Sequence, residues 1–318
     1  MKAIAAATYG PLESLTEIEV GLPVPGTGEV RVRVVASALN PADYKVITGA
    51  LKFLHARNRP LIVGYDFSGT VEAVGPGVKD FAPGDDVFGF LPYGPFNARG
   101  TFAESVVART TEIARKPGGV SHEVAAAAAT TGLTALQSIR DLGRLPKEGG
   151  EVLITGVSGG VGSISVGIAR KLHARVTAVG SGEGLDLARK LGAAEVIDRT
   201  KQPVPGDLRE RFDVVFDAAA AYRWRECRSA LKPGGTFVTT LPSLALAADK
   251  LSSLFSSTRV DFVNVKSKPG DLTLLAAWLD EGLEVPLAST IPVREVGSGL
   301  LRLQKSGGRV AVRVADGF

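Results

Sequence analysis

A chain of 318 residues is about twice the usual length of a single domain, so we expect two hydrophobic cores. Hydrophobic residues make up 45% of the chain and charged residues 22%, which excludes a disordered protein. The 37 Lys and Arg against 33 Asp and Glu give a net charge of +4. These charges are interspersed and form no basic block, so nucleic-acid binding is not indicated.

The cysteine content and the first residues bear on location. A single cysteine, Cys227, cannot form an internal disulfide and suits a reducing compartment. The opening sequence MKAIAAATYG lacks the long apolar run of a secretion signal, and the chain contains no run of 18 apolar residues. We therefore expect a cytoplasmic protein with no membrane-spanning segment.

The first part of the chain, from residue 1 to about 115, is strand-like. Short β-branched runs are separated there by Gly and Pro, which predicts a β-rich domain. Val30, Val32 and Val34 alternate with arginines, as in a strand with one buried face. Further strands are expected at GTVEAV (69–74), DVFGF (86–90) and TFAESVV (101–107).

The sequence pattern changes from strand-like to helical at Ser121, which is a candidate N-cap for an Ala-rich helix that begins near Glu123. From about Glu151 to Thr240 strands and helices alternate, which indicates a parallel sheet with helices on both faces. The expected strands are VLIT, RVTAV, EVI, FDVVFD and GTFVTT, and the expected helices are VGSISVGIARKL, LDLARKLG and a segment near Tyr222 to Leu231.

The tail after about residue 265 holds two helical segments, DLTLLAAWLDEG and VREVGSGLLRLQKSG, and a closing strand, RVAVRV. We expect this tail to return to the first domain. The predicted fold is α/β, with a β-rich domain over 1–122, a second domain with a doubly wound parallel sheet over 123–262, and a return to the first domain over 263–318. The alternating run RVDFVNV (259–265) predicts an exposed sheet edge at which a homodimer forms.

The segment EVLITGVSGGVGSISVGIARKL indicates a strand, a Gly-rich turn and a helix. Gly156, Gly159 and Gly162 are spaced three apart, as a tight turn that lets the backbone approach a pyrophosphate requires. An ordinary strand-to-helix turn can also carry glycines. The alternating strands and helices that follow favour a nicotinamide dinucleotide.

The end of the second strand of this domain bears on which dinucleotide binds. Gly180 and Ser181 stand where an acidic residue would bind the ribose of NAD, and the small hydroxyl leaves room for a 2′-phosphate. NADPH is therefore favoured. Glu183 could instead be the ribose acceptor of an NAD enzyme, although we expect its GSGEG loop to be solvated. Arg199, after the strand EVID, could reach the phosphate or lie on the surface.

Several motifs occur in a family-specific order. They are SALNPADYKVITG (37–49), GYDFSGTVEAVGPGV (64–78), PGDDVFGF (83–90), TTGLTAL (130–136), GVSGGVG (156–162) and GGRVAVRV (307–314). In these motifs the chain resembles the medium-chain dehydrogenase/reductase superfamily over almost its whole length, and most closely its quinone oxidoreductases (zeta-crystallin-like) and alkenal/one reductases. The resemblance implies a GroES-like catalytic domain and a Rossmann domain that binds NADPH.

The residues needed for zinc are missing from these motifs. Zinc sites need thiolates and imidazoles at set places. The chain has Ser37 to Asn40 where zinc alcohol dehydrogenases carry a Cys, and Tyr65 and Asp66 where they carry a His-Glu pair. The stretch from Phe90 to Gly100 holds no cysteine for a structural zinc. We therefore expect a zinc-free enzyme, in which Cys227, His55, His122 and His173 are structural or surface residues.

Without a metal, the expected chemistry is hydride transfer to a quinone or an α,β-unsaturated carbonyl, with donors stabilising the oxyanion that forms. The resemblance places Asn40 and Lys45 beside nicotinamide and substrate. Tyr44 and Tyr65 are further candidates to donate a proton or line the pocket. Lys45 could instead be a solvated charge and Tyr65 a core residue, and Asp43 is expected only to hold the loop. The resemblance implies a cofactor set of Asn40, Lys45, Thr131, Gly156, Ser158, Gly159, Gly160, Val161, Gly162, Ser181, Arg199, Leu241 and Arg309.

Other functions remain open from the sequence. An enoyl-thioester reductase of the same fold would need a channel for a long acyl carrier, of which the sequence shows no clear sign. A non-catalytic nucleotide-sensing or RNA-binding protein would not need Asn40 and Lys45. A Rossmann protein whose substrate half has drifted is a third alternative. The natural substrate does not follow from the sequence.

Overall fold

The computed structural model describes the chain except residues 53–59, 95–98, 205–207 and 307 and the side chains of 305 and 306. The chain divides into two compact units. Unit 1 comprises Met1–Thr130 and Lys266–Phe318, and unit 2 comprises Thr131–Val265. The boundaries therefore lie a few residues after the positions 122 and 262 expected from the sequence. The first falls inside helix α2 (His122–Leu136), whose N-terminus Ser121 caps by accepting the Val124 N–H at 3.2 Å.

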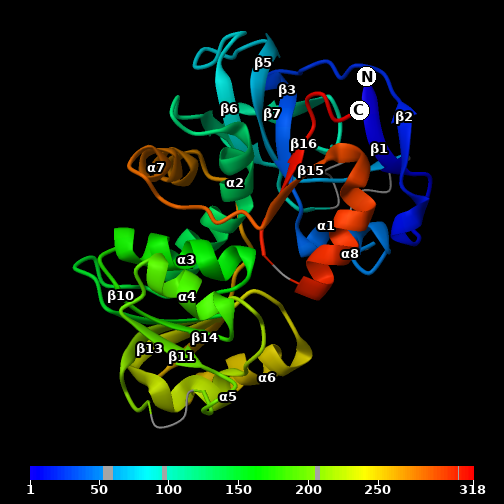
Figure 1. Cartoon of the computed structure of the whole chain (residues 1–318). Helices are drawn as coiled ribbons and strands as arrows, with labels where there is room; N and C mark the ends of the chain where they lie inside the picture. Colours follow the sequence, from blue (N-terminus) through cyan, green and yellow to red (C-terminus); the bar gives the residue numbers. More distant parts are fainter. Residues whose placement is uncertain (53–59, 95–98, 205–207, 307) are drawn as a thin grey trace. The chain divides into compact units, whose positions relative to one another are not determined.

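Unit 1 is built mainly of antiparallel strands in two sheets (Figure 1). One sheet has the order β2-β1-β4, and the larger has the order β15-β16-β3-β5-β6-β8, with β7 paired to β3. The strands are β1 (Lys2–Ala6), β2 (Thr16–Glu19), β3 (Glu29–Ala38), β4 (Leu61–Ile62), β5 (Asp66–Val74), β6 (Asp86–Phe90), β7 (Ser105–Arg109), β8 (Ile113–Arg115), β15 (Ser289–Pro292) and β16 (Val310–Arg313). The other elements are α1 (Pro41–Ile47), α2, α7 (Pro269–Asp280), α8 (Val296–Ser306) and the 3₁₀ turns η1 (Leu12–Ser14), η2 (Thr110–Glu112) and η5 (Val293–Glu295).

The segment NPADYK, expected from the sequence to be a loop, begins helix α1. Pro41 occupies the first helical position, where its missing N–H is not needed. The Asp43 carboxylate accepts the backbone N–H of Asn40 at 2.7 Å and so stabilises the N-terminus of this helix. The side chains of α1 are therefore fixed by helical geometry.

Unit 2 holds a six-stranded parallel sheet of order β11-β10-β9-β12-β13-β14, which is the strand order of a Rossmann fold. In Figure 1, α3 and α4 cover one face of this sheet, and α5 and α6 the other. The strands are β9 (Glu151–Thr155), β10 (Arg175–Gly180), β11 (Glu195–Asp198), β12 (Phe212–Asp217), β13 (Leu231–Thr239) and β14 (Arg259–Phe262). The helices are α3 (Gly160–Lys171), α4 (Glu183–Lys190), α5 (Trp224–Cys227), α6 (Leu244–Ser253), the 3₁₀ turn η4 (Arg228–Ala230) and the π-helix η3 (Gln137–Leu142). The α/β fold with a GroES-like and a Rossmann part is confirmed.

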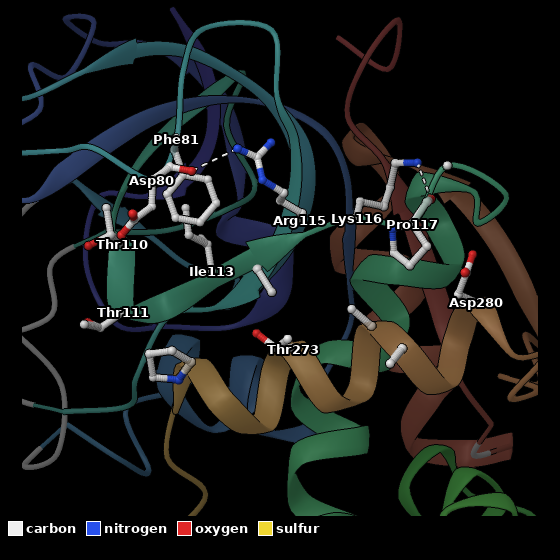
Figure 2. A pocket seen from close by; sticks show the side chains of 15 residues that line it. Asp80, Phe81, Thr110, Thr111, Ile113, Arg115, Lys116, Pro117, Thr273 and Asp280 are labelled. Carbon is white, nitrogen blue, oxygen red and sulfur yellow. Dashed lines mark hydrogen bonds between the residues drawn. The ribbon is translucent and has the colours of Figure 1, made fainter.

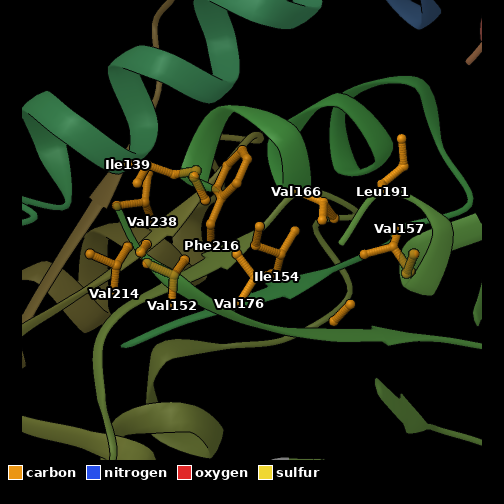
Figure 3. Close-up of a cluster of buried hydrophobic side chains, with 14 residues drawn as sticks. Ile139, Val152, Ile154, Val157, Val166, Val176, Leu191, Val214, Phe216 and Val238 are labelled. Atoms are coloured by element: carbon orange, nitrogen blue, oxygen red, sulfur yellow. The ribbon is translucent and has the colours of Figure 1, made fainter. Parts of the chain in front are cut away.

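Apolar side chains from alternate positions of the central strands form the core of unit 2. Val152 and Ile154 of β9 pack with Phe216 of β12 and Val166 of α3, as Figure 3 shows. Leu153, between them in the chain, packs on the opposite face with residues of α5 and α6. These strands are rich in apolar residues because both faces of the sheet are buried.

Two predicted elements of unit 2 are shorter than expected. The helix expected near Tyr222 to Leu231 is one turn, α5, followed by η4, because Pro233 disfavours helical conformation before it and the chain enters β13 at Leu231. Strand β14 ends at Phe262 and forms one edge of the sheet. No helix in the described part of the chain is long and apolar enough to span a membrane.

Candidate active site

The turn between β9 and α3 requires glycine at two positions. Gly156 has a φ of +70°, and a Cβ added to it would lie 2.7 Å from the Ala219 Cβ. A Cβ on Gly162 would lie 2.2 Å from the carbonyl oxygen of Gly156. The backbone therefore folds back on itself, as a turn that brings amides close to a pyrophosphate must. Gly159 is the N-cap of α3, and the exposed Ser158 precedes it.

The other expected residues of this turn, Gly160 and Val161, are half-buried and form the first turn of α3. Backbone amides at a helix N-terminus have no partner within the helix and favour an anion. The local geometry thus fits a dinucleotide pyrophosphate.

A buried carboxylate braces the strand end that leads into this turn. Thr155, the last residue of β9, donates from Oγ1 to Asp217 at 2.5 Å, and Asp217 also accepts the Tyr222 N–H at 2.9 Å. Burial raises the pKa of Asp217, while these hydrogen bonds favour its charged form. The ends of β9 and β12 are held together beside Gly156. This role was not expected from the sequence, although the acidic residue that closes the run FDVVFD was a signal for it.

The ends of β10 and β11 bring together two expected cofactor residues. The Arg199 guanidinium donates to Ser181 Oγ at 3.3 Å, and its backbone N–H donates to Gly180 at 3.0 Å. Both side chains are at least partly exposed. Glu183, the competing ribose acceptor, is exposed at the start of α4. A hydroxyl and a guanidinium at one point can both donate to a phosphate.

Two further expected cofactor residues of unit 2 lie elsewhere. Thr131 is 2% exposed in α2, and Leu241 is 46% exposed after β13. No described contact ties either of them to the turn of Gly156, so their cofactor contacts stay predictions.

In unit 1, Asn40 is held from both ends of its amide. Arg309 donates to Asn40 Oδ1 at 2.9 Å, and Asn40 Nδ2 donates to Asp66 at 2.8 Å. Arg309 also donates to the Asp66 carboxylate at 2.5 Å. Asn40 and Arg309 were expected to contact the cofactor directly, but they are 5% and 3% exposed. Their described contacts give Arg309 the role of orienting Asn40 within unit 1.

Asp66 is fully buried and has several donors. Besides Asn40 and Arg309, it receives the backbone N–H of Thr130 at 2.7 Å and the Thr130 hydroxyl at 2.5 Å. From the sequence, Asp66 was expected only as a departure from a zinc motif, not as the centre of a buried cluster. A charged residue inside the apolar stretch GYDFSGTV was the signal that it has a buried partner.

Lys45 presents a charged group at the last turn of α1. Its side chain is half-buried, and the ammonium has no hydrogen bond or ion pair to any residue that the structure describes. Tyr44, beside it, is also half-buried. Tyr65 is 1% exposed and its ring centroid lies 4.3 Å from that of Tyr93, so it is a core residue as well as a candidate donor. Burial raises the pKa of Tyr65, so the phenol keeps its proton.

The described residues include no group of three or more His, Cys, Asp or Glu that could hold a metal ion. At the positions discussed above, Ser37 donates to the carbonyl of Asp66 at 2.6 Å, and the Asp66 carboxylate is paired with Arg309. A cation paired to a carboxylate competes with a metal, so these residues do not fit zinc.

The cysteine and histidines have other surroundings. Cys227 is 1% exposed, and burial raises the pKa of its thiol to about 12. His122 Nδ1 lies 2.8 Å from Ser68 Oγ, and His173 is exposed. His55 lies outside the described residues.

A separate pocket of about 730 Å³ in unit 1 contains none of the expected site residues (Figure 2). It lies between α7 and the strand β8. Its cations have internal partners, because Arg115 donates to Asp85 and Asp80, and Lys116 donates to the carbonyl of Pro117. Both of these cations are therefore already engaged within unit 1.

Known proteins share these features over most of the chain. Residues 26–118 match the alcohol dehydrogenase GroES-like domain family, and residues 191–309 match the zinc-binding dehydrogenase family. The quinone-oxidoreductase QR1 of Triphysaria versicolor, a chloroplastic protein, is 32% identical over 295 residues, which are 89% of this chain and 88% of that protein. The chain belongs to the medium-chain dehydrogenase/reductase family. Its relatives there include quinone oxidoreductases, which confirms the resemblance seen in the motifs.

Two further comparisons extend this result. The mitochondrial NAD(P)H oxidoreductase RTN4IP1 of Mus musculus is 36% identical over 242 residues, which are 70% of this chain but only 60% of that protein. The quinone oxidoreductase structure from Coxiella burnetii superposes with a TM-score of 0.86 at 25% identity and covers 99% of both chains. A zinc-binding family name thus applies to a chain in which the described residues do not fit zinc.

Proposed function

We propose that this protein reduces quinones or α,β-unsaturated carbonyl compounds with NADPH and needs no metal. The observation that carries the proposal is the half-buried Lys45 ammonium, which has no partner among the residues that the structure describes. In a family whose members include quinone and NAD(P)H oxidoreductases, such a cation suits an oxygen on which negative charge develops.

The turn of Gly156 and Gly162, with Ser158 and the N-terminus of α3, would hold the pyrophosphate of NADPH. Ser181 and Arg199 would donate to its 2′-phosphate. When bound, NADPH supplies a hydride for the substrate. The preference for NADPH over NADH rests on two donors, Ser181 and Arg199, at the point where a carboxylate would serve NAD.

The roles in unit 1 follow from charge and burial. Lys45 donates a hydrogen bond to the substrate oxygen and stabilises the negative charge that forms there. Asn40, oriented by Arg309 and Asp66, shapes the N-terminus of α1. Tyr44 belongs to the same helix, α1. Tyr65 lies near Asp43 of this helix and stays a neutral phenol. The metal-free part of the proposal is supported by the Arg309 pairing of Asp66.

The decisive experiment is an NADPH consumption screen across quinones, enals, enones and enoyl thioesters. We expect turnover with quinones or enones. Turnover only with enoyl thioesters would reassign the substrate. NADPH binding without oxidation by any electrophile would replace the enzyme with a nucleotide-sensing protein.

We further propose that β14, an edge strand, pairs with the same strand of a second copy to form a homodimer.

The cytoplasmic location stays a prediction. The two relatives compared by sequence above are a mitochondrial and a chloroplastic protein.

A further inference from the structure

Asp43 lies in the first turn of α1, and part of its carboxyl group is not used by the fold. The residue is 0% exposed. Its Oδ2 accepts the Asn40 N–H at 2.7 Å, whereas its buried Oδ1 has no hydrogen-bond partner among the described residues. An ionised carboxylate is costly in such a place, because burial removes its water and the nearby Asn40 and Gly64 N–H groups only partly offset that loss.

Arg309 attracts the Asp43 carboxylate through its charge, but the ion pair of Arg309 is with Asp66. The charged and titratable groups that face it are Asp66 on β5, Arg309 before β16, and the phenols Tyr65 and Tyr93. Arg309 forms its ion pair with Asp66 and gives its other described hydrogen bonds to Ala127, Leu39 and Asn40.

Burial is the main cause that raises the pKa of Asp43, to about 8, and the charge of Asp66 acts in the same direction. The two carboxyl groups therefore differ: Asp66 is the partner of a guanidinium, and Asp43 has none.

We propose that Asp43 is held as the neutral carboxylic acid and supplies the proton that the reduction consumes. The inference rests on the proposed reductase function and adds a proton source to it. Each hydride added to a carbon of the substrate requires one proton at its oxygen. The O–H bond at Asp43 Oδ1 breaks and a new O–H bond forms on the substrate through one intervening water or hydroxyl, which passes on one proton for each it receives. The Asp43 carboxylate then takes its next proton from solvent.

This reverses the role expected from the sequence, where Asp43 only held the loop because a charged carboxylate would oppose the forming oxyanion. A neutral acid does not oppose it. Apolar burial is a general way to keep a carboxylic acid protonated near pH 7. Lys45 and Asp43 both belong to helix α1, but residues two apart leave a helix on different faces, so the proton of Asp43 must pass through an intervening water or hydroxyl to reach the oxygen that Lys45 stabilises.

The variant that separates this role from a structural one is Asp43→Asn. Its amide oxygen can still accept the Asn40 N–H, but the side chain carries no acidic proton. The matched control is Asp66→Asn in the same cluster, which removes the counter-ion of Arg309. We expect Asp66→Asn to lower the melting temperature at every pH, because it leaves a buried cation without its partner.

The first measurement is stability against pH by scanning calorimetry, which needs no substrate. The folded-state pKa of about 8 lies above the ordinary value of 3.8. The protonated group therefore stabilises the fold fully below the ordinary value, and this contribution is lost as the pH rises through about 8. Asp43→Asn should thus gain stability relative to wild type across this window. If the difference in stability between Asp43→Asn and wild type does not change with pH, Asp43 is not held as the neutral acid.

The second measurement is turnover on the best quinone or enone. Wild-type turnover should fall above about pH 8, and Asp43→Asn should lower it at neutral pH by roughly 10²-fold without that fall. The NADPH dissociation constant should stay within about twofold. Wild-type turnover with an unchanged pH profile in Asp43→Asn would overturn the proton role. If wild type reduces nothing, the proposed function fails, and the calorimetry still decides the state of Asp43.

Discussion

Lys45 is the residue whose replacement tests the chemistry most directly. Lys45→Ala should lower turnover by roughly 10² to 10³, the size expected when one oxyanion donor is lost, with the NADPH dissociation constant much less affected. Lys45→Met keeps a side chain of similar length without the charge, and it should lower turnover as Lys45→Ala does. Lys79→Ala, which removes an exposed lysine of unit 1, should leave turnover unchanged. Wild-type turnover in Lys45→Ala would return this lysine to its solvated-charge interpretation.

For single residues, the sequence indicated which residues matter better than it indicated what those residues contact. Asn40 and Arg309 were expected to contact the cofactor, which stays a prediction, and the structure adds that both belong to a buried cluster. Their mutual contact joins positions 269 residues apart in the chain. Such a pairing depends on tertiary folding and leaves no local periodicity or spacing to find. Asp43 was named, but the missing partner of Oδ1 could only be seen once the helix was packed.

Among the elements, the ends of β10 and β11 test cofactor choice. Arg199→Ala should weaken NADPH binding about tenfold and leave NADH binding nearly unchanged, because a charge-assisted contact to a phosphate is lost. Arg189→Ala, an exposed arginine of α4, is the control and should affect neither. Calorimetric titration checks both. Equal weakening of the two cofactors would assign Arg199 to fold stability.

The turn between β9 and α3 gives a second test at this scale. Gly162→Ala should lower the free energy of unfolding by about 1 to 3 kcal/mol, because its Cβ would meet the backbone of Gly156 at 2.2 Å. The control is Gly270→Ala in α7, where an added Cβ meets nothing within 4 Å and stability should not fall. Chemical denaturation measures both. A stable Gly162→Ala that binds NADPH normally would mean that the turn relaxes.

Elements with strong local patterns were predicted well. FDVVFD and DVFGF match β12 and β6 residue for residue, and the Gly-rich turn precedes α3 as expected. Elements were predicted less well where tertiary contacts or a proline determine where they begin and end. The strand expected at 101–107 begins only at Ser105, since Thr101 instead bonds to Ser37 and Ala103 forms an isolated bridge to Ala3.

For the molecule as a whole, the lack of fitting zinc ligands among the residues that the structure describes predicts metal independence. Strong chelators should leave NADPH oxidation unchanged, because the Asp66 carboxylate is paired with Arg309 and Ser37 donates its proton internally. Activity before and after chelation, with elemental analysis of the purified protein, measures this. Stoichiometric tightly bound zinc would contradict it.

The assembly proposed through β14 predicts a particle of twice the chain mass of 33.1 kDa. An edge strand with unpaired backbone groups favours pairing with a second strand. Light scattering over a range of protein concentrations checks this. A monomer at all concentrations would remove the homodimer.

Unit 1 is discontinuous in the chain, and this has a consequence for biosynthesis. Unit 2 is one continuous stretch, Thr131–Val265, and can fold as soon as it has left the ribosome. Unit 1 must wait, because the buried carboxylate of Asp66 receives its guanidinium from Arg309, which is synthesised after all of unit 2. Until then Asp66 and its neighbours form a nascent half-domain with an uncompensated charge. Chaperone engagement during synthesis should therefore concentrate on residues 1–130, although they are made before unit 2.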